Sequence, residues 1–398
     1  MTTPAANPFR YGALALDEAF TDRERELKEL ASDVLNGQDV VIFAPRRYGK
    51  SSLVWRVQQE LAKKRVLIAH VDLMTAPTKE KLAEKLARTI HEDIASVVFR
   101  AREAALEVFR GLRVTPTITI DPNDASVSFA FETGRASEDV DGTLERLLAL
   151  PGELAADRKR KVALVLDEFQ EIVEIDPHLP KLMRAVFQTQ PEVAHLYLGS
   201  RRHMMRRIFS DENEPFWRSA KQMELGVIPP ALFAPFIGER FAATNRRIDD
   251  EAVALILSVT HGHPYGTQEL CYFTWEATRS RGRATVDTVG VGLSAVLRSE
   301  HAHFTLLWEG LSAGQRVLLE ALAHAPGRPY SAEYRRRQRL PAATNVQKAV
   351  GALVGRELIE KRGDGAYVVS EPFLAEWIVR LISPEQRNSN PSAQQPAP

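Results

Sequence analysis

The sequence is poor in cysteine and carries no excess charge of either sign. Its 398 residues include one cysteine, Cys271, which excludes an internal disulfide framework and a zinc site built from cysteines. Lys and Arg total 52 and Asp and Glu also total 52, so the formal net charge is zero. This balance excludes a strongly basic coat for non-specific nucleic-acid binding, although it is compatible with a local basic patch.

Long apolar runs are also missing, and the first residues do not predict a leader segment. No stretch approaches the ~18 consecutive apolar residues that are needed to cross a bilayer, so we expect no membrane partner. The first residues, MTTPAANP, lack the basic and apolar regions of a secretory signal. With 44% apolar and 26% charged residues, the composition is that of a globular protein. These features predict a soluble, cytoplasmic chain of two or three domains.

Short β-rich apolar runs alternate with helical patterns in the first half of the chain. Strands separated by helices favour a parallel sheet that is covered on both faces, and therefore an α/β fold. The expected strands are 40–43, 66–71, 162–166 and 194–198, and the clearest expected helices are 23–36, 78–98 and 178–190.

The pattern changes beyond about Pro229, where the strand signal stops and a helical segment begins. Helices at about 312–323 and 343–357, followed by a strand, a Gly-rich turn and another strand, are typical of a winged helix. We expect disordered ends at 1–7 and 383–398, a first domain at 8–228 with a β-hairpin insertion at about 114–133, a helical domain at 229–305 and a winged helix at 306–382.

A phosphate-loop pattern, G-x-x-x-x-G-K-[ST], follows the first strand, with Ala44 in place of the first glycine. Backbone N–H groups at the start of a helix favour a polyphosphate, and Gly49 permits its close approach. Lys50 would reach the β- and γ-phosphates, and Ser51 would bind Mg²⁺. The predicted nucleotide-binding residues are Ala44, Pro45, Arg46, Arg47, Tyr48, Gly49, Lys50, Ser51 and Ser52.

Two acidic residues, Asp167 and Glu168, end the apolar run that starts at Val162. A carboxylate at this edge of the sheet is suited to bind Mg²⁺ above the phosphate loop, so Asp167 is the second expected magnesium ligand. Glu168 would orient and deprotonate the attacking water. The combination with the phosphate loop predicts a nucleotide-binding site.

Several motifs together resemble the archaeal-type ATPase family, within the AAA+/STAND superfamily of P-loop NTPases. They are Asn7-Pro8-Phe9, Phe20-Thr21-Asp22-Arg23-Glu24-Arg25-Glu26-Leu27, the loop 44–51 and Leu166-Asp167-Glu168-Phe169-Gln170. The resemblance covers residues 7–382 and implies a P-loop ATPase core, a helical lid at 229–305 and a C-terminal winged helix. It also implies that the nucleotide is ATP, because a phosphate loop does not distinguish between bases.

The same resemblance implies further site residues. Ser200 matches a polar sensor of the γ-phosphate or the attacking water, and its alternative is a helix cap. Arg218 matches an arginine finger that acts in cis or in trans, and its alternative is a solvated surface arginine. Gly262, His263 and Pro264 match a nucleotide-sensing lid motif, and their alternative is a simple turn. No sensor arginine stands beside this motif, so slow hydrolysis is expected.

The winged-helix segment leaves the partner open. Residues 306–382 contain 11 Lys and Arg against 8 Asp and Glu, a modest excess. The Tyr334–Arg339 run precedes the expected recognition helix, on which Thr344, Gln347 and Lys348 would face outward. This arrangement is suited to phosphate contacts with duplex DNA. The alternative is a winged helix that serves protein contacts or closes over the nucleotide domain, with Arg335–Arg339 as a solvated face. Protein partners or a homo-oligomer are therefore further candidates.

Two functions therefore follow from the sequence. In the first, the protein is a Mg²⁺-dependent ATPase that moves its winged helix, with duplex DNA as a candidate partner. In the second, it is a slow nucleotide-gated switch or scaffold whose output is assembly with protein partners.

Overall fold

The computed structural model describes residues 6–12, 20–99, 102–109, 112–114, 116–121, 126–131 and 137–382. Within these residues no helix combines the length and apolar character of a membrane span. The expected disordered tail at 383–398 and the first five residues lie outside the described residues.

The chain divides into two compact units. The sheet unit consists of Arg23–Arg46 and Lys50–Gly226, and the helical unit consists of Met1–Asp22, Arg47–Gly49 and Val227–Pro398. The tip of the phosphate loop thus groups with the helical unit, whereas the residues on either side of it belong to the sheet unit.

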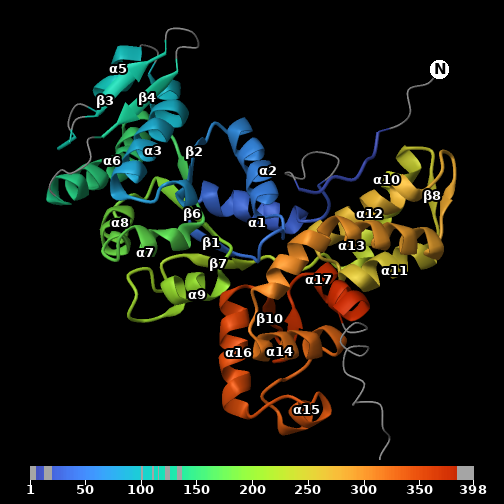
Figure 1. The fold of residues 1–398 in the computed structure, drawn as a ribbon. Helices are drawn as coiled ribbons and strands as arrows, with labels where there is room; N and C mark the ends of the chain where they lie inside the picture. Colours follow the sequence, from blue (N-terminus) through green and yellow to red (C-terminus); the bar gives the residue numbers. More distant parts are fainter. Residues whose placement is uncertain are drawn as a thin grey trace, which may run out of the picture. The chain divides into compact units, whose positions relative to one another are not determined.

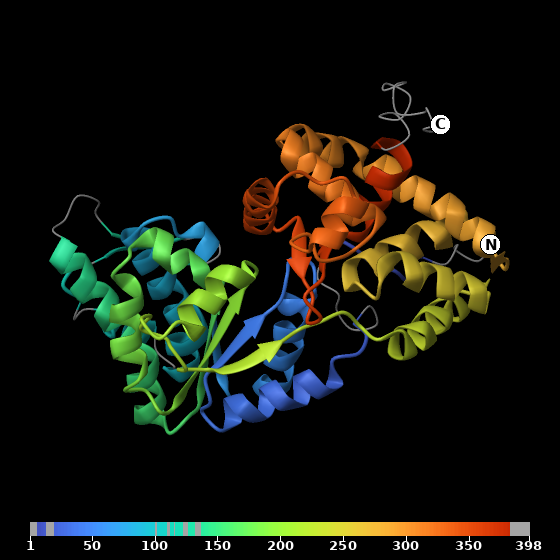
Figure 2. The same ribbon diagram turned by 90° about the horizontal axis from the view of Figure 1, so that it is seen from below.

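A five-stranded parallel sheet organises the sheet unit, in the order β2-β5-β6-β1-β7. Its strands are the arrows at the centre of that unit, with helices on both faces (Figures 1 and 2). They span Val40–Phe43 (β1), Leu67–Asp72 (β2), Val162–Asp167 (β5), Val193–Gly199 (β6) and Lys221–Glu224 (β7). The predicted α/β fold with a parallel sheet is confirmed.

The strand order decides which loops meet. Parallel strands end at the same edge of a sheet, and β6 lies between β5 and β1. The residues after β6 therefore stand between the phosphate loop, which follows β1, and the acidic pair that ends β5. Strand β7 was missed because it has only one fully buried residue, Met223, and reads as a polar segment.

The helices of the sheet unit cover a continuous apolar core. They are α1 (Glu24–Leu35), α2 (Lys50–Lys63), α3 (Lys79–Ile90), α4 (Ser96–Val98), α5 (Arg102–Glu107), α6 (Ser137–Arg158), α7 (Ile172–Ile175), α8 (Leu179–Phe187) and α9 (Arg202–Ser210). The single helix expected at 78–98 was wrong in detail, because a π-helical turn at His91–Ala95 separates α3 from α4.

Within the expected hairpin segment, β3 (Thr117–Ile120) and β4 (Val127–Ala130) pair in antiparallel register, with Ile118 opposite Phe129. Their connecting turn at 122–125 lies outside the described residues. Val127 and Phe129 are buried and the residues between and after them are exposed, so β4 shows the alternation of a strand with one face on the core.

The helical unit begins with α10 (Pro230–Ala243), α11 (Asp250–Thr260), α12 (Pro264–Ala277) and α13 (Val286–Glu309). The expectation that no strand follows Pro229 in this segment was wrong. Two short strands, β8 (Arg247–Ile248) and β9 (Arg283–Ala284), pair in parallel. Two residues are too few to show an alternating pattern in a sequence, which explains the error.

The C-terminal segment has the order of a winged helix. It contains α14 (Ala313–His324), α15 (Ala332–Arg337), α16 (Ala343–Gly355), the antiparallel strands β10 (Ile359–Lys361) and β11 (Tyr367–Val369), α17 (Pro372–Trp377) and a π-helical turn at Ile378–Ile382. Trp308 and Trp377 pack edge to face with ring centroids 6.3 Å apart, and both are buried in the core of the helical unit.

Candidate active site at the carboxyl edge of the sheet

The phosphate loop joins β1 to α2, and Lys50 is the first residue of that helix. The Lys50 side chain is buried and its Nζ donates to the Ala44 carbonyl oxygen at 3.3 Å, so the ammonium group lies over the loop. Gly49 has a φ of +85°, which an L side chain rarely adopts. Ala44 is not among the residues with positive φ, so the departure from the glycine pattern requires no strained backbone.

The tip of the loop contacts the predicted lid motif within the helical unit. The rings of Tyr48 and His263 meet edge to face with centroids 4.7 Å apart. His263 caps α12, because its Nδ1 accepts the Gly266 N–H at 3.1 Å. Burial, together with the positive charge of Arg47, lowers the pKa of His263 to about 4, so the ring is neutral at physiological pH.

Gly262 makes the turn that precedes α12. Its φ is +72°, and its carbonyl oxygen accepts the Ile228 N–H at 2.9 Å. The turn interpretation of residues 262–264 is therefore observed. A nucleotide-sensing role would need a contact between His263 and the phosphate loop, and the contact with Tyr48 provides one. The sensing role itself stays a prediction.

Two arginines in the loop differ in their surroundings. Arg46 is exposed. Arg47 forms an ion pair with Glu371 at 3.0 Å, and its guanidinium lies 4.3 Å from the centroid of the Tyr265 ring. These partners belong to the helical unit together with Arg47. Sequence reasoning missed both, because they lie more than 200 residues away along the chain.

Glu168 and Ser200 meet at the ends of neighbouring strands. The Ser200 hydroxyl donates to Oε2 of Glu168 at 2.7 Å, and the Ser200 backbone N–H donates to the same oxygen at 3.3 Å. Ser200 does not cap α9, whose N-cap residue is Arg201 without a side-chain cap, so the capping interpretation was wrong. Glu168 has a left-handed backbone, φ 51° and ψ 47°, a strain that is common at functional sites.

Asp167 is the last residue of β5. Its Oδ1 accepts the Glu168 N–H at 2.9 Å, and its Oδ2 lies 3.7 Å from Nε2 of His70 on β2. Sequence reasoning missed His70, since only the pairing of β2 with β5 brings it to this carboxylate. The Ser51 hydroxyl and the Asp167 carboxylate are hard oxygen ligands, which fit Mg²⁺.

Within the described residues, no cluster of three or more His, Cys, Asp or Glu side chains offers a complete metal site. The assignment of Ser51 and Asp167 as Mg²⁺ ligands stays a prediction.

Arg218 is exposed, and its guanidinium lies 5.2 Å from the centroid of the neighbouring Trp217 ring. The adjacent Phe216 is fully buried against Phe169 and Tyr197, which anchors the segment that carries Arg218. Among the described residues, Arg218 makes no hydrogen bond or ion pair with another predicted site residue, and its action in cis or in trans stays a prediction.

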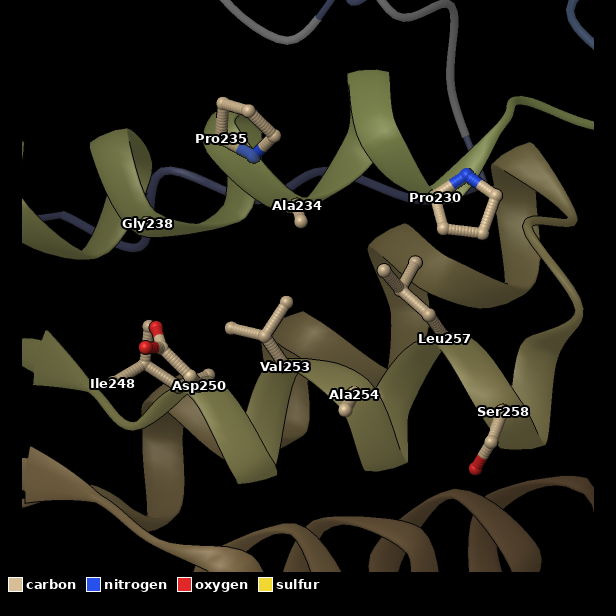
Figure 3. Close-up of a pocket in the computed structure, with 10 residues that line it drawn as sticks. All are labelled: Pro230, Ala234, Pro235, Gly238, Ile248, Asp250, Val253, Ala254, Leu257 and Ser258. Atoms are coloured by element: carbon tan, nitrogen blue, oxygen red, sulfur yellow. The ribbon is translucent and has the colours of Figure 1, made fainter.

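A separate groove of about 710 Å³ lies between α10 and α11 in the helical unit. Val253 and Leu257 of α11 point toward Pro230 and Ala234 of α10 across it (Figure 3). Its ionic lining is limited to the carboxylate of Asp250. This chemistry does not suit a phosphate, so the groove is not the nucleotide site.

Comparisons with known proteins identify the family of this chain. A family model for an ATPase domain that is predominantly from Archaea matches residues 20–218. The chain belongs to this ATPase family. A second family model, for a probable winged helix domain, matches residues 302–380 of this ATPase. The predicted family and the predicted C-terminal winged helix are both confirmed.

The chain is also similar to several solved structures. A Walker-type ATPase of Pyrococcus abyssi is 15% identical, with a TM-score of 0.65 over 92% of this chain and 97% of that chain. The ORC1 protein of Aeropyrum pernix in complex with DNA is 14% identical, with a TM-score of 0.48 over 96% and 100% of the two chains. The RuvB Holliday junction branch migration motor of Thermotoga maritima is 13% identical, with a TM-score of 0.42 over 96% and 98%. No curated protein sequence gives a significant match.

Proposed function

We propose that this protein is a Mg²⁺-dependent ATPase that couples its nucleotide state to movement of the winged helix on duplex DNA. The observation that supports this best is the bond between Glu168 and Ser200, at the sheet edge where the phosphate loop and Asp167 also end. A carboxylate that can take a proton from water, beside a hydroxyl that can bind a phosphate oxygen, is the arrangement that hydrolysis needs.

Each residue at this edge has a defined task. Lys50 and the backbone N–H groups at the start of α2 bind the phosphates of ATP, and the helix dipole adds to their attraction. Ser51 and Asp167 hold Mg²⁺, which when bound neutralises charge on the phosphate oxygens. Glu168 orients the attacking water and accepts its proton, while Ser200 donates to the γ-phosphate.

Gly262, His263 and Pro264 sense the nucleotide through the tip of the phosphate loop, which belongs to the same unit. His263 is neutral and lies against Tyr48 of the loop tip, so a change in the loop on nucleotide binding would act directly on the start of α12. Arg218 is exposed and free to act in trans, on the nucleotide of a neighbouring copy in a homo-oligomer.

The ion pair between Arg47 and Glu371 supports coupling to the winged helix. Glu371 is the N-cap residue of α17, directly after the wing strand β11. A loop arginine that turns toward a bound phosphate would leave Glu371, and α17 would lose that contact. Nucleotide binding and the winged helix are then linked through one side chain.

The surface of the winged helix supports DNA as the partner. Thr344, Gln347 and Lys348 are exposed on α16, whereas Val346 and Val350 of the same helix are buried. Arg336, Arg337 and Arg339 before this helix, and Lys361 and Arg362 on the wing, are also exposed. Cations beside a recognition helix and on the wing are suited to phosphate contacts.

The first experiment measures ATP hydrolysis by the full chain and by Lys50→Ala, with and without duplex DNA. We expect DNA to stimulate turnover, and we expect the substitution to lower turnover by at least about 100-fold, because the ammonium group stabilises phosphate charge in the transition state. Equal turnover in the two proteins would refute the proposed site.

A second function, a slow nucleotide-gated switch that acts through protein partners, is favoured by the sequence around Gly262-His263-Pro264, which has no sensor arginine beside it. Tight retention of ATP, negligible turnover with and without DNA, and an ATP-dependent change in oligomer size would decide for the switch.

A further inference from the structure

Oε2 of Glu168 accepts three hydrogen bonds. Two come from the hydroxyl and the backbone N–H of Ser200, and the third comes from Nε2 of Gln170 at 2.6 Å. Within the described part of the chain, the other carboxylate oxygen of Glu168 has no hydrogen-bond partner. The three donors therefore hold Oε2 in place and leave the second oxygen to receive a water proton.

Gln170 is placed at a cost. Its side chain is fully buried, and its Oε1 has no hydrogen-bond partner. A buried amide oxygen without a partner destabilises the folded state, whereas an apolar side chain of similar volume would avoid that penalty. Gly199 leaves room for this amide, since a Cβ at Gly199 would lie 2.7 Å from Oε1 of Gln170. The hydrogen bond from Gln170 to Glu168 is what the protein gains from this unfavourable burial.

Ser200 alone cannot keep Glu168 in place during the reaction. A hydroxyl has one proton to donate, and in this structure Ser200 donates it to Glu168. When the same proton is donated to a γ-phosphate oxygen, Glu168 loses its hydroxyl donor. Of the side chains that the structure describes, Gln170 is then the one whose hydrogen bond still holds the carboxylate.

We propose that Gln170 is a positioning residue that holds the Glu168 carboxylate in its working orientation while the Ser200 hydroxyl binds the γ-phosphate. This role rests on the proposed ATPase function. Gln170 also lies 3.4 Å, through Nε2, from Oε1 of Glu171, whose carboxylate pairs with Arg201 at 3.4 Å. The loop after β5 thus contacts the loop after β6 twice, through Glu168 with Ser200 and through Glu171 with Arg201.

The test compares Gln170→Met with Gln190→Met in the full chain. Gln190 is a matched control, because it is also buried, also has an Oε1 without a partner, and donates to the backbone oxygen of Leu148 instead of a catalytic group. We expect kcat to fall by about 100-fold in Gln170→Met, with KM and equilibrium ATP affinity within about twofold of wild type, since misplaced catalytic groups lower the rate of the chemical step. Gln190→Met keeps its kcat.

Hydrogen exchange in the nucleotide-free protein gives a second readout. The Ser200 backbone N–H is protected by its bond to Glu168. A carboxylate released by Gln170→Met moves away from this N–H, so its exchange accelerates relative to wild type and to Gln190→Met. Unchanged exchange at Ser200 would overturn the proposal.

Gln170→Glu separates donation from packing. The introduced carboxyl group donates a hydrogen bond to Glu168 only when it is protonated, and repels Glu168 when it is ionised. We expect turnover relative to wild type to rise as the pH falls from 8 to 5.5, whereas a purely structural defect shows no such recovery.

The two proposals fail differently. Equal turnover in wild type and Lys50→Ala defeats the ATPase site. Lys50-dependent turnover with a wild-type kcat in Gln170→Met defeats the role of Gln170 and leaves the ATPase intact.

Discussion

Glu269 on α12 is a carboxyl group with no exposed surface, and among the described residues neither of its carboxylate oxygens has a hydrogen-bond partner. Burial raises its pKa to about 8, and the negative charges of Glu300 and Glu371 contribute to the rise. Arg47 lowers the pKa only in part. The folded state therefore holds Glu269 protonated, as a neutral group, at pH values where the unfolded chain has lost the proton.

The sign of the pH effect follows directly. Between pH 4.5 and about 8 the folded state binds more protons at this position than the unfolded state, so the free energy of unfolding decreases as the pH rises. The difference between the two pKa values, at about 1.4 kcal/mol for each pH unit, corresponds to about 5 kcal/mol. We expect a measured effect of about 3–5 kcal/mol, because relaxation and water entry reduce the cost of a buried charge.

Glu269→Gln removes this dependence. At pH 5 the variant and the wild type carry neutral side chains of similar shape, so their stabilities should be similar. At pH 9 the variant should be more stable by about 3–5 kcal/mol, because it has no charge to bury. Urea unfolding followed by tryptophan fluorescence measures this, since Trp275, Trp308 and Trp377 all belong to the helical unit.

Glu276→Gln is the matched control, because Glu276 is exposed on the same helix. Its difference from wild type should stay within about 0.5 kcal/mol at both pH values. A Glu269→Gln variant whose stability relative to wild type is the same at pH 5 and pH 9 would refute the reasoning. A buried carboxyl that ionises in this range must make the free energy of unfolding depend on pH.

Three further predictions concern the lid turn, the catalytic carboxylate and the winged helix. Gly262→Ala should destabilise the protein by about 2–4 kcal/mol in urea unfolding. A side chain at φ +72° is strained, and its Cβ would lie 2.2 Å from the Ile228 carbonyl oxygen. The control is the helical Gly290, which should tolerate alanine because a Cβ there meets no atom within 4 Å. Glu168→Gln should keep ATP affinity and lose at least about 100-fold in turnover, and full turnover would exclude Glu168 as the base. Lys348→Ala should lower duplex affinity and reduce the slope of log K against log salt by about 1, whereas an unchanged slope would remove Lys348 from the phosphate contacts.

Much of the fold was readable in the sequence because parallel strands covered on both faces are continuous apolar runs. This is why 40–43 and 162–166 were expected as strands, and why the loop between Ala44 and Ser51 was expected before a helix. Strand β7 had no such signal, because an edge strand with one buried residue does not differ from a loop in its composition.

The sequence alone determined the kind of chemistry, since a Gly-Lys-Ser loop and an Asp-Glu pair have few other uses when each follows a strand. Only the tertiary structure decided which groups touch. The order β5-β6-β1 brought Ser200 to Glu168. The buried side chain of Gln170 donates a hydrogen bond to the same oxygen of Glu168. Strand neighbours are chosen by hydrogen bonds and packing between segments far apart in the chain, and no local pattern of residues records that choice.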